Sequence, residues 1–244
     1  MTRPEGPVRP VGDQFILADP GAKRHSRWSF AAKRAMDVAV AVVGLVLLAP
    51  VIGVIAVAVR VTMGSPVLFR QVRPGYLARP FEIIKFRSML PEITTDGRQL
   101  AINDRVTKLG FILRKSSLDE LPELWNVVKG DMSLVGPRPL IMRYLPRYTP
   151  QQARRHEVRP GITGLAQITG RHTLPWDERF RLDVWYVDHW SLRDDLRIGL
   201  ATIRIALQGS GTLDSEAADF EFMGTEGDGN GDDLTEVGSG PAAD

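Results

Sequence analysis

The chain has 244 residues, 43% of them hydrophobic, which is enough for one packed domain with additional segments. It contains no cysteine, and this excludes disulfides, zinc–thiolate sites and thiol catalysis. The formal net charge of +2 hides an uneven distribution, because residues 1–212 carry all 31 lysines and arginines but only 19 of the 29 acidic residues, a net charge of +12. The basic part of the chain therefore favours anionic partners.

Both ends of the chain lack the apolar periodicity of a folded segment. Residues 1–32 include three prolines within the first ten positions and are predicted to be a disordered, basic N-terminal segment. Residues 212–244 are acidic and rich in glycine, which predicts a disordered tail that the chemistry does not need. We therefore expect a membrane segment at 33–60 and one catalytic domain at 61–211.

Residues 38–59 form an apolar run without a charged side chain. As a helix rising about 1.5 Å per residue it would measure roughly 33 Å, enough for a hydrocarbon core of about 30 Å. Basic residues flank both ends, and Ala49 is followed by Pro50 near the middle, where a proline bends a helix. These features predict a re-entrant membrane helix with both ends in the cytoplasm. A straight spanning helix and a buried soluble helix are the alternatives.

Two strands are predicted next, over PVLFRQVRP (66–74) and FEIIKFRSM (81–89), with a turn at the glycine after the first. The period of two in the second strand places Lys85 and Arg87 on one face, which is either a solvated face or part of an anion site. Helical spacing in RVTKLGFILRKS then brings Arg114 to the front of an acidic pair.

The acidic pair, Asp119 and Glu120, lies in SSLDELPELW (116–125). Ser117 and Glu120 have the spacing of a capping box, in which each side chain bonds to the other's backbone, so a structural cap is the simplest interpretation. The apolar spacing from Leu121 to Val128 predicts a helix that ends near Gly130. Pro122 is tolerated only near a helix start, so this helix is expected to begin close to the acidic pair. The alternative is a pair of catalytic carboxylates, and this stretch alone does not decide between the two.

Two loops rich in glycine and proline follow the helix. In GDMSLVGPRPL, Arg138 stands between two prolines, which restrict the backbone and present a guanidinium suited to phosphate. In VRPGITGLAQITGR, Arg159 and Arg171 surround several glycines, a pattern that fits either a phosphate-binding loop or an ordinary hairpin. The four histidines show no zinc-type spacing, so a metal bound here would be a hard cation such as Mg²⁺.

The last periodic segment has one apolar helical face, which either docks on a membrane or packs on the protein's own core. The residues of this face are Leu196, Leu200, Ile203 and Leu207. The positive charge of the body suits anionic inner-membrane lipid. Nucleic acid is not expected as a partner, because no nucleic-acid motif accompanies the charge. A non-enzymatic membrane scaffold or a basic-patch binding protein is the alternative to an enzyme.

Four blocks of sequence, KFRSM, RKSSLDELPELWNVVKGDMSLVGPRPL, VRPGITGLAQITGR and LDVWYVDHWSLRDDLRI, together resemble the bacterial sugar transferase family. These are the monotopic polyprenol-phosphate phosphoglycosyl transferases, and the resemblance runs from about Lys33 to Gln208. It implies an α+β fold: a small mixed helical and strand catalytic domain with a re-entrant, proline-kinked N-terminal membrane helix and interfacial amphipathic helices. Members often have Ser-Pro at the kink, where this chain has Ala49-Pro50. The chain resembles a small, minimal member, without additional spanning helices upstream.

The resemblance also implies an activity. Such enzymes transfer a sugar-1-phosphate from a UDP-sugar to undecaprenyl phosphate at the cytoplasmic face of the bacterial inner membrane, release UMP and start a glycan such as an exopolysaccharide, O-antigen, capsule or glycoprotein. The family's nucleophile maps onto Asp119 and its partner carboxylate onto Glu120, and both are expected to hold Mg²⁺. An aspartyl-phosphosugar intermediate is expected, and a homodimer is an open alternative. The residues expected to bind substrate are Lys85, Arg87, Arg114, Arg138 and Arg159.

Overall fold

The computed structural model describes residues 9–11, 14–16, 26–91, 105–170 and 174–208, and the predicted acidic tail therefore lies outside the described residues. Strands β1 (Arg9–Val11) and β2 (Gln14–Ile16) form a short antiparallel pair near the N-terminus. Helix α1 (Arg27–Met63) begins before position 33, where the membrane helix was expected to start. The N-terminal segment of 1–32 is thus more structured than its composition predicts.

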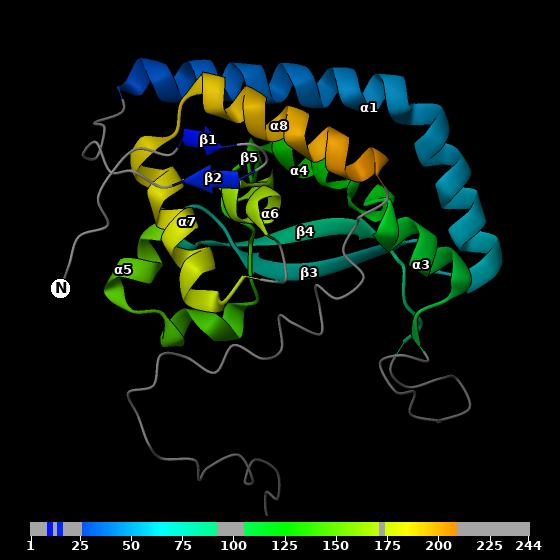
Figure 1. The fold of residues 1–244 in the computed structure, drawn as a ribbon. Helices are drawn as coiled ribbons and strands as arrows, with labels where there is room; N and C mark the ends of the chain where they lie inside the picture. The colour runs from blue at the N-terminus through cyan, green and yellow to red at the C-terminus, as the bar shows by residue number, and fades with distance from the viewer. Residues whose placement is uncertain (1–8, 12–13, 17–25, 92–104, 171–173, 209–244) are drawn as a thin grey trace, which may run out of the picture.

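Helix α1 is 37 residues long and is the one helix in the described part of the chain that is long and apolar enough to cross a membrane. Ser26 begins it by accepting a hydrogen bond from the backbone of Ser29, and Gly64, with φ 77°, ends it. Pro50 lies inside the helix, which bends near its middle without being interrupted (Figure 1). Its first half packs against α4 (Glu123–Lys129), and its second half descends beside α3 (Lys108–Lys115) (Figure 1). Most of its apolar side chains point away from the body.

The two predicted strands are β3 (Leu68–Pro74) and β4 (Pro80–Phe86). They pair antiparallel with Arg70 opposite Ile84, and the short 3-10 helix η1 (Tyr76–Ala78) closes the turn. Ile83 and Phe86 of β4 are buried, Ile83 beside α4 and Phe86 beside the second half of α1. The hairpin thus supports both α4 and the membrane helix.

Three short helices follow: α3 (Lys108–Lys115), η2 (Leu118–Glu120) and α4 (Glu123–Lys129). Thr107 caps α3 by accepting a hydrogen bond from the backbone of Gly110 at 3.0 Å. Helix α4 starts directly after Pro122, because a proline is tolerated only in the first turn of a helix. It ends at Gly130, whose φ of 98° is the left-handed conformation that glycine adopts most readily. The stop is the one that the sequence predicts. The start is later than expected, because the acidic pair lies in η2 and α4 begins at Glu123.

Strand β5 (Ser133–Val135) pairs in parallel with β6 (Gly161–Thr163). The hairpin interpretation of VRPGITG is therefore wrong, because this segment pairs with a distant strand. The two loops meet so closely that a Cβ atom on Gly161 would lie 2.1 Å from the backbone nitrogen of Gly136, which only glycine permits. This close approach brings the loop of Arg138 against the loop of Arg159.

The remaining helices complete the body. They are η3 (Met142–Arg147), α5 (Pro150–Ala153), η4 (Arg154–Glu157), α6 (Leu165–Thr169), α7 (Trp176–His189) and α8 (Leu192–Leu207). Their main core is formed by Leu182 and Tyr186 of α7, Ile198 of α8 and Trp190 between them, all at most 2% exposed. This mixture of helices with small sheets confirms the predicted α+β class.

Candidate active site

The acidic segment does not form the predicted capping box. Ser117 has φ 57°, in the left-handed region, and its side chain caps no backbone group of η2. The carboxylate of Glu120 points instead toward two cationic side chains, Lys85 and Arg138. The cap interpretation of this carboxylate is therefore wrong, because stronger charged partners from distant segments take the place of the serine backbone.

The two cations share one oxygen of the glutamate. Lys85 Nζ and Arg138 Nη2 each donate to Oε1 of Glu120 at 2.9 Å, and Lys85 Nζ also lies 3.1 Å from Oε1 of Glu123. The four side chains are between 2% and 22% exposed. Strand β4, helix η2, helix α4 and the loop after β5 thus each contribute one charged group to a single buried cluster. Lys85 is part of this cluster and does not belong to a solvated face.

Burial and charge separate the pKa values of the three carboxyl groups. Burial raises the pKa of Asp119 to about 6, with the neighbouring Glu120 carboxylate adding to the effect. Burial also disfavours the charged form of Glu120. The positive charges of Lys85 and Arg138 outweigh this effect and lower the pKa of Glu120 to about 2. Burial raises the pKa of Glu123 to about 7, although Lys85 opposes this shift. At neutral pH Glu120 is fully ionised, while Asp119 is ionised and unusually basic for an aspartate.

Arg114 lies at the same centre, as the sequence predicts. Its side chain is buried at the end of α3, where one guanidinium nitrogen lies 3.0 Å from the sulfur of Met89. It is close enough to act on Asp119, since its charge lowers the pKa of that carboxyl against the effects of burial and of Glu120. These charged side chains therefore form one group, which we call the carboxylate centre. Its members are Asp119, Glu120, Glu123, Lys85, Arg114 and Arg138.

Arg138 is held by a buried ion pair that the sequence did not indicate. Arg155 donates to the backbone carbonyl of Arg138 at 2.8 Å and pairs with Asp183 of α7 at 2.7 Å. Both members of the pair are almost fully buried. Two prolines stiffen the loop of Arg138, as predicted, but Arg155 fixes its position. No local spacing could have revealed this pair, because it joins residues far apart in the sequence.

Glu123 was also missed, although a signal for it exists. The segment Leu-Asp-Glu-Leu-Pro-Glu places three carboxylates within five positions. A helix starting after Pro122 turns the side chain of Glu123 back toward the segment that precedes it. The proline that marks the helix start was therefore the clue to a third acidic group in the site.

Arg87 does not lie at the carboxylate centre. Its guanidinium donates to the backbone carbonyls of Met63, Gly64 and Ser65. These groups lie at the C-terminal end of α1, where helix carbonyls have no partner within the helix. The structure thus gives Arg87 a position that secures the end of the membrane helix, separate from its neighbour Lys85.

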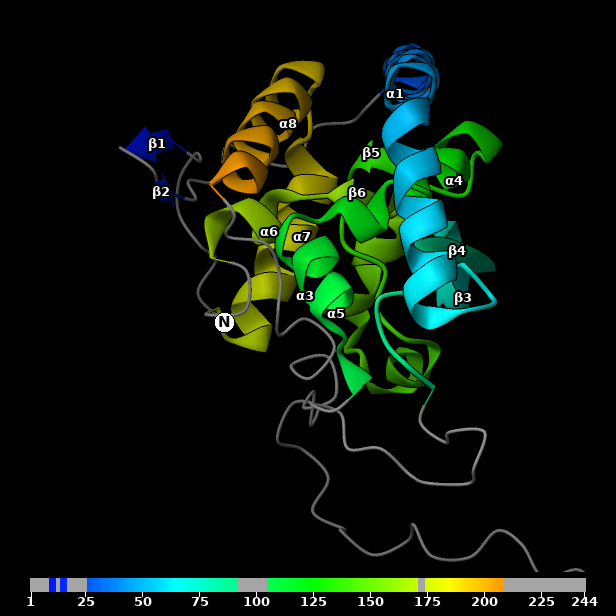
Figure 2. The ribbon, with the colours of Figure 1, turned by 90° about the vertical axis from the view of Figure 1, so that its right-hand side faces the viewer.

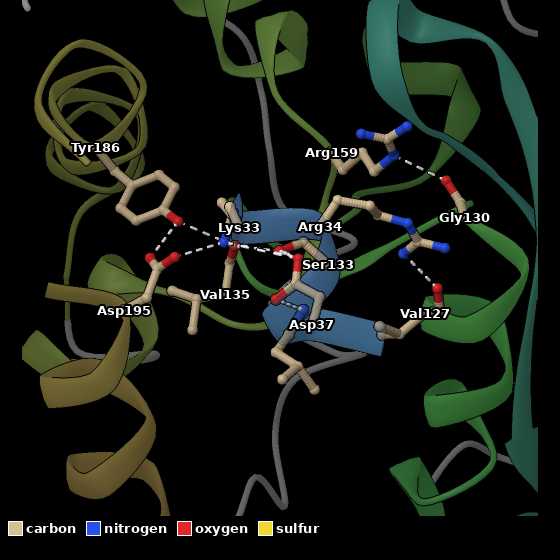
Figure 3. A network of polar contacts seen from close by, with 11 residues as sticks. Lys33, Arg34, Asp37, Val127, Gly130, Ser133, Val135, Arg159, Tyr186 and Asp195 are labelled. Atoms are coloured by element: carbon tan, nitrogen blue, oxygen red, sulfur yellow. Dashed lines mark hydrogen bonds and ion pairs between the residues drawn. The ribbon is translucent and has the colours of Figure 1, made fainter. Parts of the chain in front are cut away.

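Arg159 also lies elsewhere, at the C-terminal end of α4. Its Nε donates to the carbonyl of Gly130 at 2.9 Å, and Arg34 of α1 donates to the carbonyl of Val127 at 2.6 Å beside it (Figure 3). Both arginines thus satisfy carbonyls at the end of α4, a favourable place for a cation. Arg171 lies outside the described residues.

Helix α1 is tied to the body by a second polar network, to the left of these arginines in Figure 3. Lys33 Nζ donates to the carboxylate of Asp195 at 2.6 Å, and the Tyr186 hydroxyl donates to the same carboxylate at 2.6 Å. Lys33 and Tyr186 both also donate to the carbonyl of Val135. These buried contacts fix the first half of α1 against α7, α8 and β5.

A magnesium ion fits the centre only with help from substrate. The described residues contain no group of three or more His, Asp or Glu side chains placed to hold a metal. Asp119 and Glu120 nevertheless supply the hard carboxylate oxygens that Mg²⁺ prefers, and this ion is commonly held by one or two carboxylates together with substrate phosphates. The predicted pair could therefore hold Mg²⁺ if phosphate oxygens and water complete its ligands.

A cavity of about 480 Å³ opens beside the carboxylate centre, and Glu120 and Arg138 form part of its wall. Opposite walls come from α1, through Val40, Gly44 and Leu48, and from α8, through Ile203 and Ala206. Figure 2 shows these two helices on either side of the sheet formed by β5 and β6. The side of the centre formed by Glu120 and Arg138 thus faces a space bounded by two helices with exposed apolar side chains.

The apolar face of α8 is turned outward. Leu196, Leu200 and Ile203 are 61%, 59% and 58% exposed, whereas Ile198 on the opposite face is buried. The alternative in which this face packs on the core is therefore wrong for these three residues, and the Leu207 side chain lies outside the described part. Exposed valines and leucines also cover α1. Such continuous apolar surface is typical of contact with a bilayer.

The fold and the site define a class: a membrane-anchored α+β protein with a buried carboxylate–cation centre suited to phosphoryl chemistry. The sequence profile of the bacterial sugar transferase family matches residues 28–209, and the chain belongs to this family. The match includes α1 except its first residue, Arg27, and every residue of the carboxylate centre. The family that the motifs suggested is thereby confirmed.

The chain is similar to several proteins that are named as sugar transferases or sugar phosphotransferases. The chain is 49% identical over 196 residues to the uncharacterized sugar transferase EpsL of Bacillus subtilis, covering 80% of this chain and 97% of that protein. It is 42% identical over 183 residues to a UDP-glucose:undecaprenyl-phosphate glucose-1-phosphate transferase of Caulobacter vibrioides, covering 70% and 68%. It is 36% identical over 208 residues to the undecaprenyl-phosphate galactose phosphotransferase of Salmonella typhimurium, of which it covers only 43%.

Proposed function

We propose that this protein is a phosphoglycosyl transferase that moves a sugar-1-phosphate from a UDP-sugar to undecaprenyl phosphate and releases UMP. The observation that carries the proposal is Asp119, an ionised but basic carboxylate beside Lys85, Arg114 and Arg138. The names of the Caulobacter and Salmonella relatives support this reaction class. The relatives named for glucose and for galactose are similarly related to this chain, so the sugar is left open.

In the first step, a carboxylate oxygen of Asp119 attacks the sugar-bearing phosphorus of the UDP-sugar. A bond forms between that oxygen and phosphorus, the bond from phosphorus to the bridging oxygen breaks, and UMP leaves with the electron pair. The product is an acyl phosphate on Asp119. A pKa near 6 suits this role, because the carboxylate is largely ionised at neutral pH yet more basic than an ordinary aspartate.

In the second step, a phosphate oxygen of undecaprenyl phosphate attacks the same phosphorus. The bond to Asp119 breaks, the carboxylate is restored, and the sugar is left on a lipid diphosphate. Neither step needs water or a redox partner. One difficult transfer is thereby divided into two displacements at the same phosphorus.

The basic groups have separate tasks in these steps. Arg114 and Arg138 stabilise the negative charge on the phosphoryl oxygens. Lys85 and Arg138 are held in place by Glu120, whose low pKa keeps it charged throughout. Bound Mg²⁺, held by Asp119 and Glu120, would neutralise diphosphate charge and stabilise the leaving UMP. Arg87 and Arg159 receive no role in this scheme, because the structure places them at helix ends.

We further propose that the protein lies in the bacterial inner membrane with its body in the cytoplasm, where UDP-sugars are available. Basic side chains flank both ends of the apolar run, and α1 bends at its middle (Figure 1). A bend allows both ends to remain on one side of the bilayer. The non-enzymatic scaffold loses its main support, because Glu120 is an ion-pair partner and not a helix cap.

Intact-protein mass spectrometry tests the mechanism. Purified protein mixed with a panel of UDP-sugars, without lipid acceptor, should gain the mass of one sugar phosphate and release one equivalent of UMP. Asp119→Asn should show neither, since an amide cannot form the acyl phosphate. Asp177→Asn, an exposed aspartate outside the centre, is the matched control and should behave as wild type. An active Asp119→Asn protein would refute the assignment, and a dead variant without any wild-type adduct would favour a single-step transfer.

A further inference from the structure

The cavity beside the carboxylate centre has two unlike ends. Its charged lining includes Glu120 and Asp183 but also three arginines, Arg138, Arg155 and Arg179, so that this end carries a net positive charge. Its remaining walls are largely apolar and include residues of α1, α4, α6 and α8. A ligand that fills this space therefore needs an anionic group at one end and an apolar portion at the other.

We infer that this cavity holds the lipid acceptor, with the isoprene units next to its phosphate lying between α1 and α8. The inference rests on the proposed function and adds to it the site and route of the second substrate. The phosphate of the acceptor faces the arginine-rich end beside the carboxylate centre. The hydrocarbon chain lies against Gly44 and Leu48 of α1 and against Ile203 and Ala206 of α8.

The apolar walls continue onto the outer surface of the same helices. Ile203 lines the cavity and is itself 58% exposed, and Leu200 lies one turn before it on α8 at 59% exposed. On α1, Leu47 is 72% exposed and adjoins Leu48 of the cavity wall. A hydrocarbon chain can pass from a bilayer against these faces into the cavity without its apolar surface meeting water.

The nucleotide fits this space less well. Uracil and ribose carry several polar groups, and burying such groups without hydrogen-bond partners is unfavourable. The walls from α1 offer only apolar side chains and glycine, namely Val40, Gly44 and Leu48. Polar side chains, including Thr163, Gln167 and Thr202, line other parts of the cavity. The part against α1 therefore suits the apolar chain of the acceptor better than the nucleotide of the donor.

Gly44 offers a specific test of this arrangement. It lines the cavity, and a Cβ atom at this position would lie 3.4 Å from Cδ1 of Leu124, an ordinary contact distance. A larger side chain at position 44 would therefore occupy the cavity. Gly53 lies in the same helix, but a Cβ atom at that position would have no neighbouring atom within 4 Å. Gly44→Leu fills the cavity, and Gly53→Leu makes the same chemical change outside it.

The experiment uses the full-length protein in detergent and the UDP-sugar that gives the wild-type adduct. Gly44→Leu should form the sugar-phosphate adduct and release UMP at the wild-type rate. Its KM for undecaprenyl phosphate should rise about tenfold or more, as expected when methylene groups no longer fit an apolar pocket. Its KM for dimethylallyl phosphate, which has a single isoprene unit, should change much less. Gly53→Leu should match the wild type in all three measurements.

Ala206→Leu provides a second cavity-filling variant from α8. Its control is Gly199→Leu on the same helix, at a half-buried position where a Cβ atom would meet no atom within 4 Å. The Ala206→Leu variant guards against a folding defect specific to Gly44→Leu. Slower adduct formation with an unchanged acceptor KM in both cavity variants would mean that the donor occupies the cavity and would overturn the inference. Unchanged kinetics in both would overturn it as well. A wild-type protein that forms no adduct and releases no UMP would instead refute the proposed function.

Discussion

The ammonium group of Lys85 lies 2.9 Å from Oε1 of Glu120, although 35 positions separate the two residues. The same oxygen accepts a hydrogen bond from Arg138. The charged carboxylate of Glu120 thus orients two cations beside Asp119. Cations that are already in position stabilise developing negative charge without having to reorganise during the reaction. The pair thus links the hairpin of β3 and β4 to the nucleophile that we propose.

The first prediction concerns pH. Asp119 attacks as a carboxylate, and its raised pKa of about 6 means that this form is lost as the pH falls through 6. At pH 5 about a tenth of the groups remain ionised, so adduct formation should be slower than at neutral pH by about tenfold. Rapid-quench measurement of the UMP burst from pH 5 to 8 checks this.

The first half-reaction is the right one to measure, because the acceptor phosphate itself titrates near pH 6. Glu123, with a pKa of about 7, also titrates in the measured range, whereas Glu120 at about 2 does not. Glu123→Gln should therefore keep the fall below pH 6 while removing any change near pH 7. A burst rate that is flat from pH 5 to 8 would contradict a nucleophilic Asp119 with a raised pKa.

A second prediction separates the electrostatic role of Glu120 from a role in metal binding. Glu120→Gln removes one of the charges that raise the pKa of Asp119, so the midpoint of the pH profile should move to lower pH. Lys85 and Arg138 lose their shared charge, which should lower the free energy of unfolding by about 2 kcal/mol and reduce turnover. Chemical denaturation and the UMP burst measure the two effects.

Magnesium titration of the same variant supplies the complementary measurement. If Glu120 holds the ion, added Mg²⁺ should restore part of the burst rate without moving the pH midpoint back. A variant with wild-type stability, pH profile and magnesium dependence would show that Glu120 has neither role.

A third prediction treats Arg155 as a positioning residue for Arg138. Arg155→Met leaves Asp183 buried without its partner and should lower stability by about 3 to 5 kcal/mol. The double variant Arg155→Met/Asp183→Leu removes both charges and should recover most of that stability. Turnover should remain low in the double variant, because the carbonyl of Arg138 has still lost its donor.

The comparison of stability with turnover decides this prediction. Recovery of both in the double variant would mean that the ion pair supports only the fold. Low kcat with little change in stability would mean that the position of Arg138 depends on Arg155. The exposed pair of Arg181 and Glu178 on α7 provides a control, since its removal should affect neither measurement appreciably.

A fourth prediction concerns topology. Single cysteines at Arg27, the first residue of α1, and at Arg70 on β3 should both be protected from an impermeant thiol reagent in intact cells. Both should react after the membrane is opened. The chain has no cysteine of its own, so each label reports one position. Labelling of Arg27→Cys alone in intact cells would show that α1 spans the bilayer.

Much of the local structure was determined by the sequence itself. The apolar length of α1, the hairpin of β3 and β4, and the end of α4 at Gly130 all follow from short-range patterns. Periodicity and backbone restriction act over a few residues, so they can be recognised without knowing what packs against them. The motifs also placed Asp119 and Glu120 among the candidate residues and pointed to the correct family.

Only the tertiary structure decided what those residues contact. It replaced the capping box by the ion pairs of Glu120, added Glu123 to the centre, and separated Arg138 from Arg87, which the sequence had assigned to the same task. Arg155 and Asp183 form an ion pair although 28 positions separate them, and no local sequence pattern indicates this contact. The physical reason is that desolvation and ion pairing depend on which surfaces become buried together, and for this chain that is settled only when the hairpin, the parallel strands and the helices pack around one another.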